Sequence, residues 1–212
     1  FKPLPAQLAS LPAGTRSARV RPIEALESDP NDPPPPGHIW CKGFARMQKQ
    51  RREETNAIYP TYGDHLNGGF LSHVAGKVFV RAGQENVSLR IHNAFFNKEA
   101  DPDPAPLEDM VLVHMHAESW AHFKSFYQFR LAKGSYRESL KPAPMPDGVA
   151  LNMNQLFASL ECVDGEDALR AVFQEVCTAT PELRARLETF GHLHRVQLDL
   201  DAKRRAHFPE FS

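Results

Sequence analysis

Residues 108–137, EDMVLVHMHAESWAHFKSFYQFRLAKGSYR, place an apolar run with two histidines directly before an aromatic-rich stretch. The apolar run, DMVLVHMH at 109–116, is typical of a buried β-strand. The segment 119–134 is typical of a helix, with Ser119 as its N-cap and Gly134 as its C-terminal stop. Its apolar residues recur at helical spacing, at Trp120, Phe123, Tyr127 and Leu131. The sequence therefore predicts a strand that carries its last histidines to the start of a helix, the edge where an open α/β sheet binds ligands.

Two further strands are predicted upstream of this segment. GKVFVRAG at 76–83 and NVSLRIHNAFF at 86–96 both alternate β-branched or aromatic residues with polar ones. We expect these strands to pair through the short turn at 83–86, and residues 76–116 to supply adjoining strands of one sheet. The expected fold class is therefore α/β, a partial sheet with flanking helices.

Proline content divides the chain into three predicted regions. Residues 1–37 end in SDPNDPPPPG and are expected to form an arm or linker that resists helix and central strand, because proline lacks a backbone donor. Residues 38–141 form the α/β region. Residues 142–212 form a helical C-terminal extension that begins with a proline-rich connector, PAPMPDG at 142–148. In this extension, one helix is predicted from an apolar stripe and another from a Thr-Pro start at 180–181 and a glycine end at 191. The stripe consists of Leu169, Val172, Phe173 and Val176.

Composition excludes several classes of protein. The chain has 212 residues and a net charge of −1, so nothing global attracts it to nucleic acid or to an anionic membrane surface. Its three cysteines are widely spaced and contain no CxxC pair, which argues against a disulfide framework and favours a reducing cytoplasm. No apolar run approaches the roughly 18 residues of a transmembrane span.

His114 and His116 are the candidate metal ligands. Side chains in a strand alternate, so both imidazoles are expected on one face, about 6.6 to 7 Å apart. They could share one metal, or one could bind metal while the other contacts substrate; either could equally be an ordinary hydrogen-bonded histidine. Basic groups that could bind an anion follow on the neighbouring elements, at Lys77, Arg81, Arg90, His92 and Lys124. A solvated basic face is the alternative for the basic residues of the helix.

The succession GGFLSHVAGKVFVRAG, VSLRIHNAF and LVHMHAESWAHFKSFYQFRLAKGSYR resembles the carboxyl-terminal half of bacterial family 2-like glycosyltransferases, over roughly residues 40–140. The specific parts are GKVFVR, and a histidine followed by an aromatic-rich helix with lysine and then GSYR. The resemblance implies a GT-A-like fold. It also implies transfer of a sugar from a nucleotide-sugar donor to a hydroxyl group of a glycan or another acceptor.

The resemblance further implies roles for individual residues. In such enzymes a late histidine completes a Mn²⁺ or Mg²⁺ site, a role that falls to His114 first and to His116 as its substitute. Basic groups neutralise the diphosphate of the donor, which leaves with negative charge. The residues that match this diphosphate or substrate-binding role are Lys77, Arg81, His92 and Lys124.

The chain departs from the family's pattern at its N-terminal side. No strand-borne DxD motif and no acidic catalytic base precede residue 40, and DLD at 199–201 lies where the family has no such motif, so we interpret it as a chance match. Because the first residue is Phe, we expect an N-terminal portion to be missing, and the absent motifs indicate that this portion is the half that binds the donor. The catalytic base is not identified.

A zinc-dependent hydrolase and a noncatalytic interaction module are the alternative classes. HMHAES at 114–119 begins like the HxHxD motif of the metallo-β-lactamase fold, and His192 and His194 could add ligands. However, Ser119 stands where that motif needs a histidine, and HLHRVQ at 192–197 predicts an ordinary strand. Tightly bound stoichiometric zinc would favour the hydrolase, whereas weak Mg²⁺ or Mn²⁺ binding that appears with a sugar nucleotide would favour the transferase. An interaction module using the helical tail would show neither.

Overall fold

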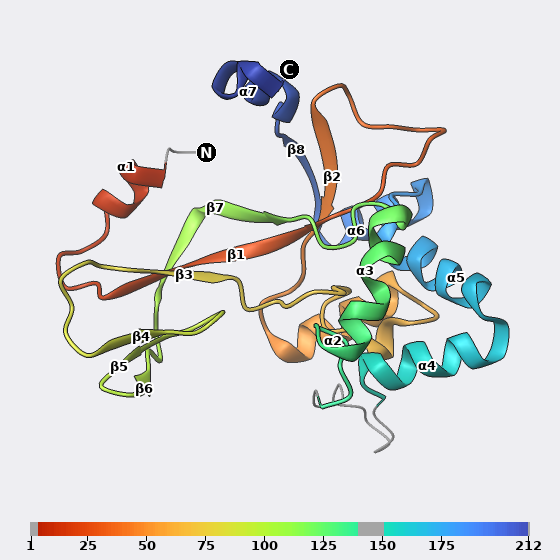
Figure 1. Cartoon of the computed structure of the whole chain (residues 1–212), viewed down its shortest axis with the longest axis horizontal. Helices are drawn as coiled ribbons and strands as arrows, with labels where there is room; N and C mark the ends of the chain where they lie inside the picture. Colours follow the sequence, from red (N-terminus) through yellow and green to blue (C-terminus); the bar gives the residue numbers. More distant parts are fainter. Residues whose placement is uncertain (1–3, 140–150, 212) are drawn as a thin grey trace. The chain divides into compact units, whose positions relative to one another are not determined.

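The computed structural model describes residues 4–139 and 151–211, which form a mixed α/β protein with seven α-helices (Figure 1). The chain divides into two compact units. Unit 1 consists of Phe1–Ile23 and His73–His114, and unit 2 consists of Glu24–Ser72 and Met115–Ser212. Each unit thus combines two separate stretches of the chain, whereas the sequence suggested consecutive regions. The predicted connector at 142–148 lies outside the described residues.

Unit 1 contains two small sheets. Its elements are α1 (Leu4–Ala9), most of β1 (Ser17–Ala25), β3 (Lys77–Val80), β4 (Val87–Leu89), β5 (Ala94–Phe96), β6 (Glu99–Ala100) and β7 (Ala105–His114). Strand β1 pairs with β3 in antiparallel register and also with β7, while β4, β5 and β6 form a separate antiparallel sheet (Figure 1). A small core of Ala18, Val20 and Leu107 supports the first sheet.

Three expectations about this unit were wrong. Residues 1–37 were expected to resist helix and central strand, but they contain α1 and β1. Strand β1 forms because its apolar residues alternate with Arg19 and Arg21. Pro22 is tolerated because it lies between the part of β1 that pairs with β3 and the part that pairs with β2. Residues 86–96 form two strands, β4 and β5, joined by a turn closed by a hydrogen bond from Arg90 N–H to the Asn93 carbonyl. Finally, β3 and β4 belong to different sheets, so residues 76–116 do not supply one sheet.

Unit 2 is mainly helical. Its elements are β2 (His38–Lys42), α2 (Gln48–Ile58), the 3-10 helix η1 (Gly63–His65), α3 (Trp120–Ala132), α4 (Met153–Asp164), α5 (Glu166–Cys177), α6 (Pro181–Thr189), β8 (Leu193–Gln197), α7 (Leu200–His207) and η2 (Pro209–Phe211). The end of β1 pairs with β2, and β2 pairs with β8, all in antiparallel register (Figure 1). The apolar faces of α3, α5 and α6 meet in one core.

Helices α3, α5 and α6 and strand β8 of unit 2 confirm the sequence predictions. The Ser119 hydroxyl caps α3 by accepting a hydrogen bond from His122 N–H at 3.2 Å, and Thr180 caps α6 in the same way. The predicted apolar stripe of α3 packs in the core, with Phe123 and Tyr127 buried and its other two members partly buried. The whole predicted stripe of α5 is buried, and the predicted strand at 192–197 is β8.

Strands β1, β2, β3 and β8 do not form the parallel edge at which the sequence suggested a ligand crevice. The pairings of β1 with β2 and β3, and of β2 with β8, are antiparallel, so these strands do not end together at one edge, as they would in an open parallel sheet. Strand β7 ends at His114, which leaves His116 beyond the strand. Across residues 4–139 and 151–211, no helix is both long and apolar enough to cross a membrane.

Candidate functional site

The two histidines predicted as metal ligands belong to different units. His114 ends β7 in unit 1, whereas His116 is buried in unit 2. His116 Nε2 lies 2.9 Å from the Tyr136 hydroxyl, and its carbonyl accepts a hydrogen bond from Arg130 at 2.7 Å. Within the part of the chain that the structure describes, no group of three or more His, Cys, Asp and Glu side chains is arranged to hold a metal ion. The metal role of His114 and His116 therefore stays a prediction.

Two of the predicted diphosphate-binding residues already have partners within their own units. Lys124 on α3 pairs with the Glu166 carboxylate of α5 in unit 2, with 2.6 Å between Nζ and Oε2. Arg81 follows β3 in unit 1 and donates from Nε to the Thr15 carbonyl at 2.8 Å and from Nη2 to the Pro12 carbonyl at 3.2 Å. Their roles in diphosphate binding stay predictions.

Lys77 and His92, by contrast, come together in unit 1. Lys77 begins β3 and donates from Nζ to the Ile91 carbonyl at 3.2 Å. His92 lies in the turn between β4 and β5, and its Nδ1 is 2.8 Å from the Gly76 carbonyl oxygen. Two hydrogen bonds thus tie the start of β3 to the turn between β4 and β5, and they place an ammonium group and an imidazole in the same part of the unit.

Arg19 of β1 joins these two residues. Its Nη1 donates to the carbonyl oxygens of Ala75 at 2.6 Å and His92 at 2.9 Å, and its Nη2 donates to Asn93 Oδ1 at 2.9 Å. Burial and the neighbouring Arg21 lower the pKa of Arg19, although an arginine keeps its charge at any physiological pH. Arg19 is therefore a cation that three hydrogen bonds hold in a fixed position.

His73 completes the group. Its ring stacks on the ring of His92, with 4.0 Å between the centroids and 19° between the planes, and its Nδ1 accepts a hydrogen bond from Ala75 N–H at 3.0 Å. Partial burial of the ring, followed by the charges of His92, Lys77 and Arg19, lowers the pKa of His73. We call Arg19, His73, Lys77 and His92 the basic cluster. Four basic side chains drawn together in this way could bind an anion of high charge.

Glycine at position 76 makes the cluster possible. Gly76 has φ of +72°, and a Cβ placed there would lie 2.0 Å from the Val20 carbonyl oxygen. Only glycine permits this turn next to β1. The turn separates His73 from Lys77 along the chain, so the glycine of the GKVFVR pattern shapes the backbone that presents both.

Sequence reasoning missed two members of the basic cluster, Arg19 and His73. Arg19 was missed because its segment was interpreted as a proline-rich arm, although the alternation in SARVRPIEA at 17–25 was the signal of a strand. His73 stands three residues before Gly76 in the quoted stretch GGFLSHVAGKVFVRAG. Its position between a serine and a short apolar run gave no sign that it would stack on His92.

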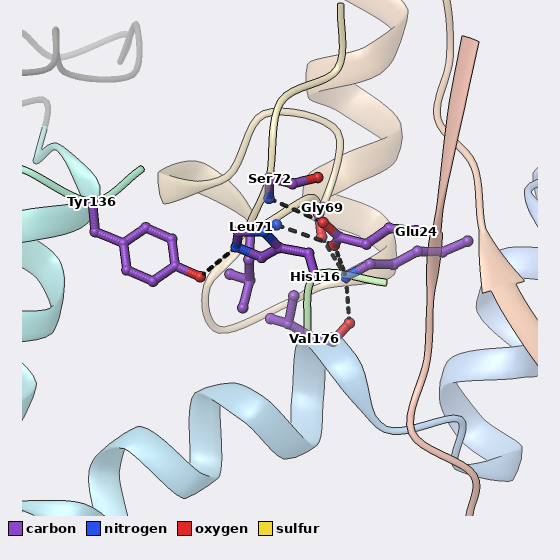
Figure 2. A network of polar contacts seen from close by, with 8 residues as sticks. Glu24, Gly69, Leu71, Ser72, His116, Tyr136 and Val176 are labelled. Carbon is purple, nitrogen blue, oxygen red and sulfur yellow. Dashed lines mark hydrogen bonds and ion pairs between the residues drawn. The ribbon is translucent and has the colours of Figure 1, made fainter. Parts of the chain in front are cut away.

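Unit 2 contains a separate polar network around Glu24, and Figure 2 shows that its members converge from several segments. The Glu24 carboxylate accepts hydrogen bonds from the backbone N–H groups of Leu71 at 3.2 Å and Ser72 at 3.0 Å. The Lys42 ammonium lies 3.2 Å from Glu24 Oε2. It also donates to the carbonyl oxygens of Gly69 at 2.6 Å and Val176 at 2.7 Å.

Glu24 and Lys42 form a charged pair inside the core. Burial alone would raise the pKa of Glu24, but Lys42, His116 and the hydrogen bonds from 71–72 outweigh it and lower the pKa. Burial alone would lower the pKa of Lys42, which its neighbours Cys177, Tyr59 and Glu24 instead raise. Burial raises the pKa values of Cys177 and Tyr59 to about 12, so both are neutral at pH 7 and the carboxylate is the charge that acts on Lys42.

The Glu24–Lys42 network is structural in character. Both side chains are at most 1% exposed, so no substrate reaches them. Their hydrogen bonds attach the segment 69–72 to β1, to β2 and to the end of α5. The basic cluster is therefore the better candidate for ligand binding, because His73 and Lys77 are exposed to solvent.

The histidines that could complete a zinc site are also in unit 2. His192 Nε2 lies 2.6 Å from a carboxylate oxygen of Glu54 on α2, and burial followed by the charge of His192 lowers the pKa of His194. These two histidines belong to no three-ligand group among the described residues. Among residues 4–139 and 151–211, no set of three ligands supports the zinc alternative.

Comparison with known proteins leaves the chain without an assigned family, since no family model, no curated protein and no solved structure matches it.

Proposed function

We propose that the chain is part of a glycosyltransferase of the GT-A type, in which the basic cluster of unit 1 binds the diphosphate of a nucleotide-sugar donor. The supporting observation is the convergence of Lys77 and His92 with Arg19 and His73. The order of sequence segments that resembles family 2-like glycosyltransferases contains three of these four residues. The acceptor would be a glycan or another compound with a free hydroxyl group, and the setting would be the cytoplasm.

The chemistry of glycosyl transfer explains why such a cluster would be useful. Negative charge builds on the nucleoside diphosphate as it leaves, so a cation beside it stabilises the transition state more than the ground state. Arg19 is already held by hydrogen bonds, so its charge needs no reorganisation during the reaction. Lys77 uses one ammonium proton on the Ile91 carbonyl and keeps others for a phosphate oxygen.

A divalent ion, Mn²⁺ or Mg²⁺, is part of the proposal only as a requirement for turnover. The described residues contain no group of three metal ligands, so the residues present do not by themselves form the expected site. The phosphate contacts of the basic cluster do not require the ion. The catalytic base is left unassigned.

Calorimetric titration tests this proposal. The chain should bind the diphosphate of UDP, GDP or ADP, and it should not bind the bare sugar. Replacing Arg19 or Lys77 by Gln should remove a charge-assisted contact of about 1.5 to 3 kcal/mol, which lowers affinity roughly 10- to 150-fold. Lys49→Gln is the matched control, because Lys49 is an exposed lysine on α2 of unit 2 whose only described ion pair is with Glu53. Equal affinities in the wild type and both cluster variants would contradict the proposal.

A further inference from the structure

Backbone groups determine which nitrogen of each stacked imidazole carries the proton. His73 Nδ1 lies 3.0 Å from the backbone nitrogen of Ala75, which can only donate, so Nδ1 holds a lone pair. A neutral His73 therefore carries its proton on Nε2. His92 Nδ1 lies 2.8 Å from the Gly76 carbonyl oxygen, which can only accept, so Nδ1 carries the proton. A neutral His92 therefore has its lone pair on Nε2.

These opposite tautomers give the two rings different capacities toward an anion. Protonation of His73 would take place at Nδ1, where it would break the hydrogen bond from Ala75 N–H. Burial and the adjacent charges of His92, Lys77 and Arg19 also lower the pKa of His73. Protonation of His92 would take place at Nε2 and would leave the bond to Gly76 intact. His92 is therefore the ring that can gain a proton without losing a contact.

We propose that His92 takes up a proton at Nε2 when a doubly charged anion binds, while His73 stays neutral and donates its Nε2–H, so that the basic cluster selects dianions over monoanions. The proton comes from solvent, and the N–H bond at Nε2 is the only covalent bond that forms. This inference rests on the proposed function, because it concerns the group that would hold the donor's diphosphate.

The charges around the stacked rings couple proton uptake to binding. His73 interacts electrostatically with His92, Lys77 and Arg19. Arg19 in turn is repelled by Arg21 and attracted by the carboxylate of Asp101. A doubly charged anion at the cluster favours a proton on His92 Nε2, whereas a singly charged anion does so less strongly. Binding of the dianion and protonation of His92 therefore strengthen each other.

Sulfate and methyl sulfate are the probes that separate the binding of a doubly charged anion from that of a singly charged one. Sulfate stays doubly charged across the neutral pH range, so any proton taken up on binding belongs to the protein, and methyl sulfate is a singly charged ion of similar shape. Calorimetry in two buffers of different protonation enthalpy counts the protons. We expect uptake approaching one proton for sulfate, with affinity falling by about tenfold per pH unit as pH rises through that range. Methyl sulfate should bind at least about tenfold more weakly, with little proton uptake.

A matched pair of variants assigns the proton to one ring. In His92→Asn, the amide nitrogen can still donate to the Gly76 carbonyl, but no nitrogen can be protonated, so proton uptake and pH dependence should disappear. In His73→Asn, the amide oxygen can still accept from Ala75 N–H, but the Nε2–H donor is lost, so affinity should fall while proton uptake is kept. His122→Asn, on α3 of unit 2, is the control and should change neither.

Imidazole ¹⁵N spectra of the free chain give a readout that needs no ligand and does not depend on the variants folding. They should show the Nε2–H tautomer for His73 and the Nδ1–H tautomer for His92, and the opposite assignment at either ring overturns the inference. Binding of sulfate without proton uptake, or uptake that persists in His92→Asn, overturns the inference, and the proposed function then stands if UDP also binds. Sulfate binding with proton uptake, but no binding of any nucleoside diphosphate, supports the inference and overturns the proposed function. Absence of binding by all these anions overturns both.

Discussion

Replacing Lys42 by Met should strongly destabilise unit 2, because the change leaves the Glu24 carboxylate buried without its cation. The Lys42 ammonium lies 3.2 Å from Glu24 Oε2, and both side chains are at most 1% exposed. The carbonyl oxygens of Gly69 and Val176 lose their donor in the same change. Removal of one partner from a buried ion pair costs about 3 to 5 kcal/mol, a large fraction of the stability of a small protein.

The pH dependence of stability should also change sign in Lys42→Met. In the wild type the pKa of Glu24 is lowered, so the pair contributes stability above the ordinary carboxyl pKa of about 4.3, and this is lost as pH falls through the lower folded value. Without Lys42, burial raises the pKa of Glu24, so the folded state binds a proton more readily than the unfolded state. The variant should therefore lose stability as pH rises above about 4.3.

Urea unfolding followed by tryptophan fluorescence measures the stability of unit 2, because both tryptophans, Trp40 and Trp120, lie in that unit. With a slope of roughly 2 kcal/mol per molar urea, the expected loss lowers the midpoint by roughly 1.5 to 2.5 M. The double variant Glu24→Gln/Lys42→Met removes both charges and should recover much of the loss. A single variant as stable as the wild type, or a double variant as unstable as the single one, would refute the reasoning.

Three further changes probe the basic cluster and the helices. Gly76→Ala should destabilise unit 1 by more than about 1 kcal/mol and abolish UDP binding in calorimetry, because its φ is +72° and a Cβ would meet the Val20 carbonyl; retained UDP affinity would contradict this. Ser119→Ala should cost about 1 kcal/mol through loss of the cap of α3, measured as a lower urea midpoint; an unchanged midpoint would show that the cap is dispensable. Lys124→Ala should leave UDP affinity unchanged, because Lys124 already pairs with Glu166; a fall as large as that for Lys77→Gln would instead support the diphosphate role implied by the resemblance.

Helices α3, α5 and α6 of unit 2 could be predicted because their signals are local. Ser119 and Thr180 cap the helices that follow them, and the apolar stripes of α3 and α5 face the core. Caps and stripes depend on residues a few positions apart, so the sequence shows them without knowledge of the tertiary fold.

The strands and the basic cluster depended on contacts that the sequence does not show. Strand β1 was not predicted because the prolines around it suggested an irregular arm. Glu24 and Lys42 are charged, so a hydropathy pattern places them at the surface, although they form a buried pair. Arg19 reaches the carbonyl groups of Ala75 and His92 across 56 and 73 residues of sequence. Of the predicted site residues, only Lys77 and His92 are brought together in this cluster, because both lie next to turns that fold back on β1 and β3.

Binding of a nucleoside diphosphate at the basic cluster can be tested in one titration. UDP and GDP are added to the chain while the imidazole signals of His73 and His92 and the guanidinium signal of Arg19 are followed by NMR, with the bare nucleosides as controls. We expect these three side chains to respond together and to saturate with the diphosphate, and to respond to neither nucleoside. Cluster signals that stay unchanged at saturating diphosphate, or changes confined to unit 2, would contradict the assignment of this cluster as the diphosphate site.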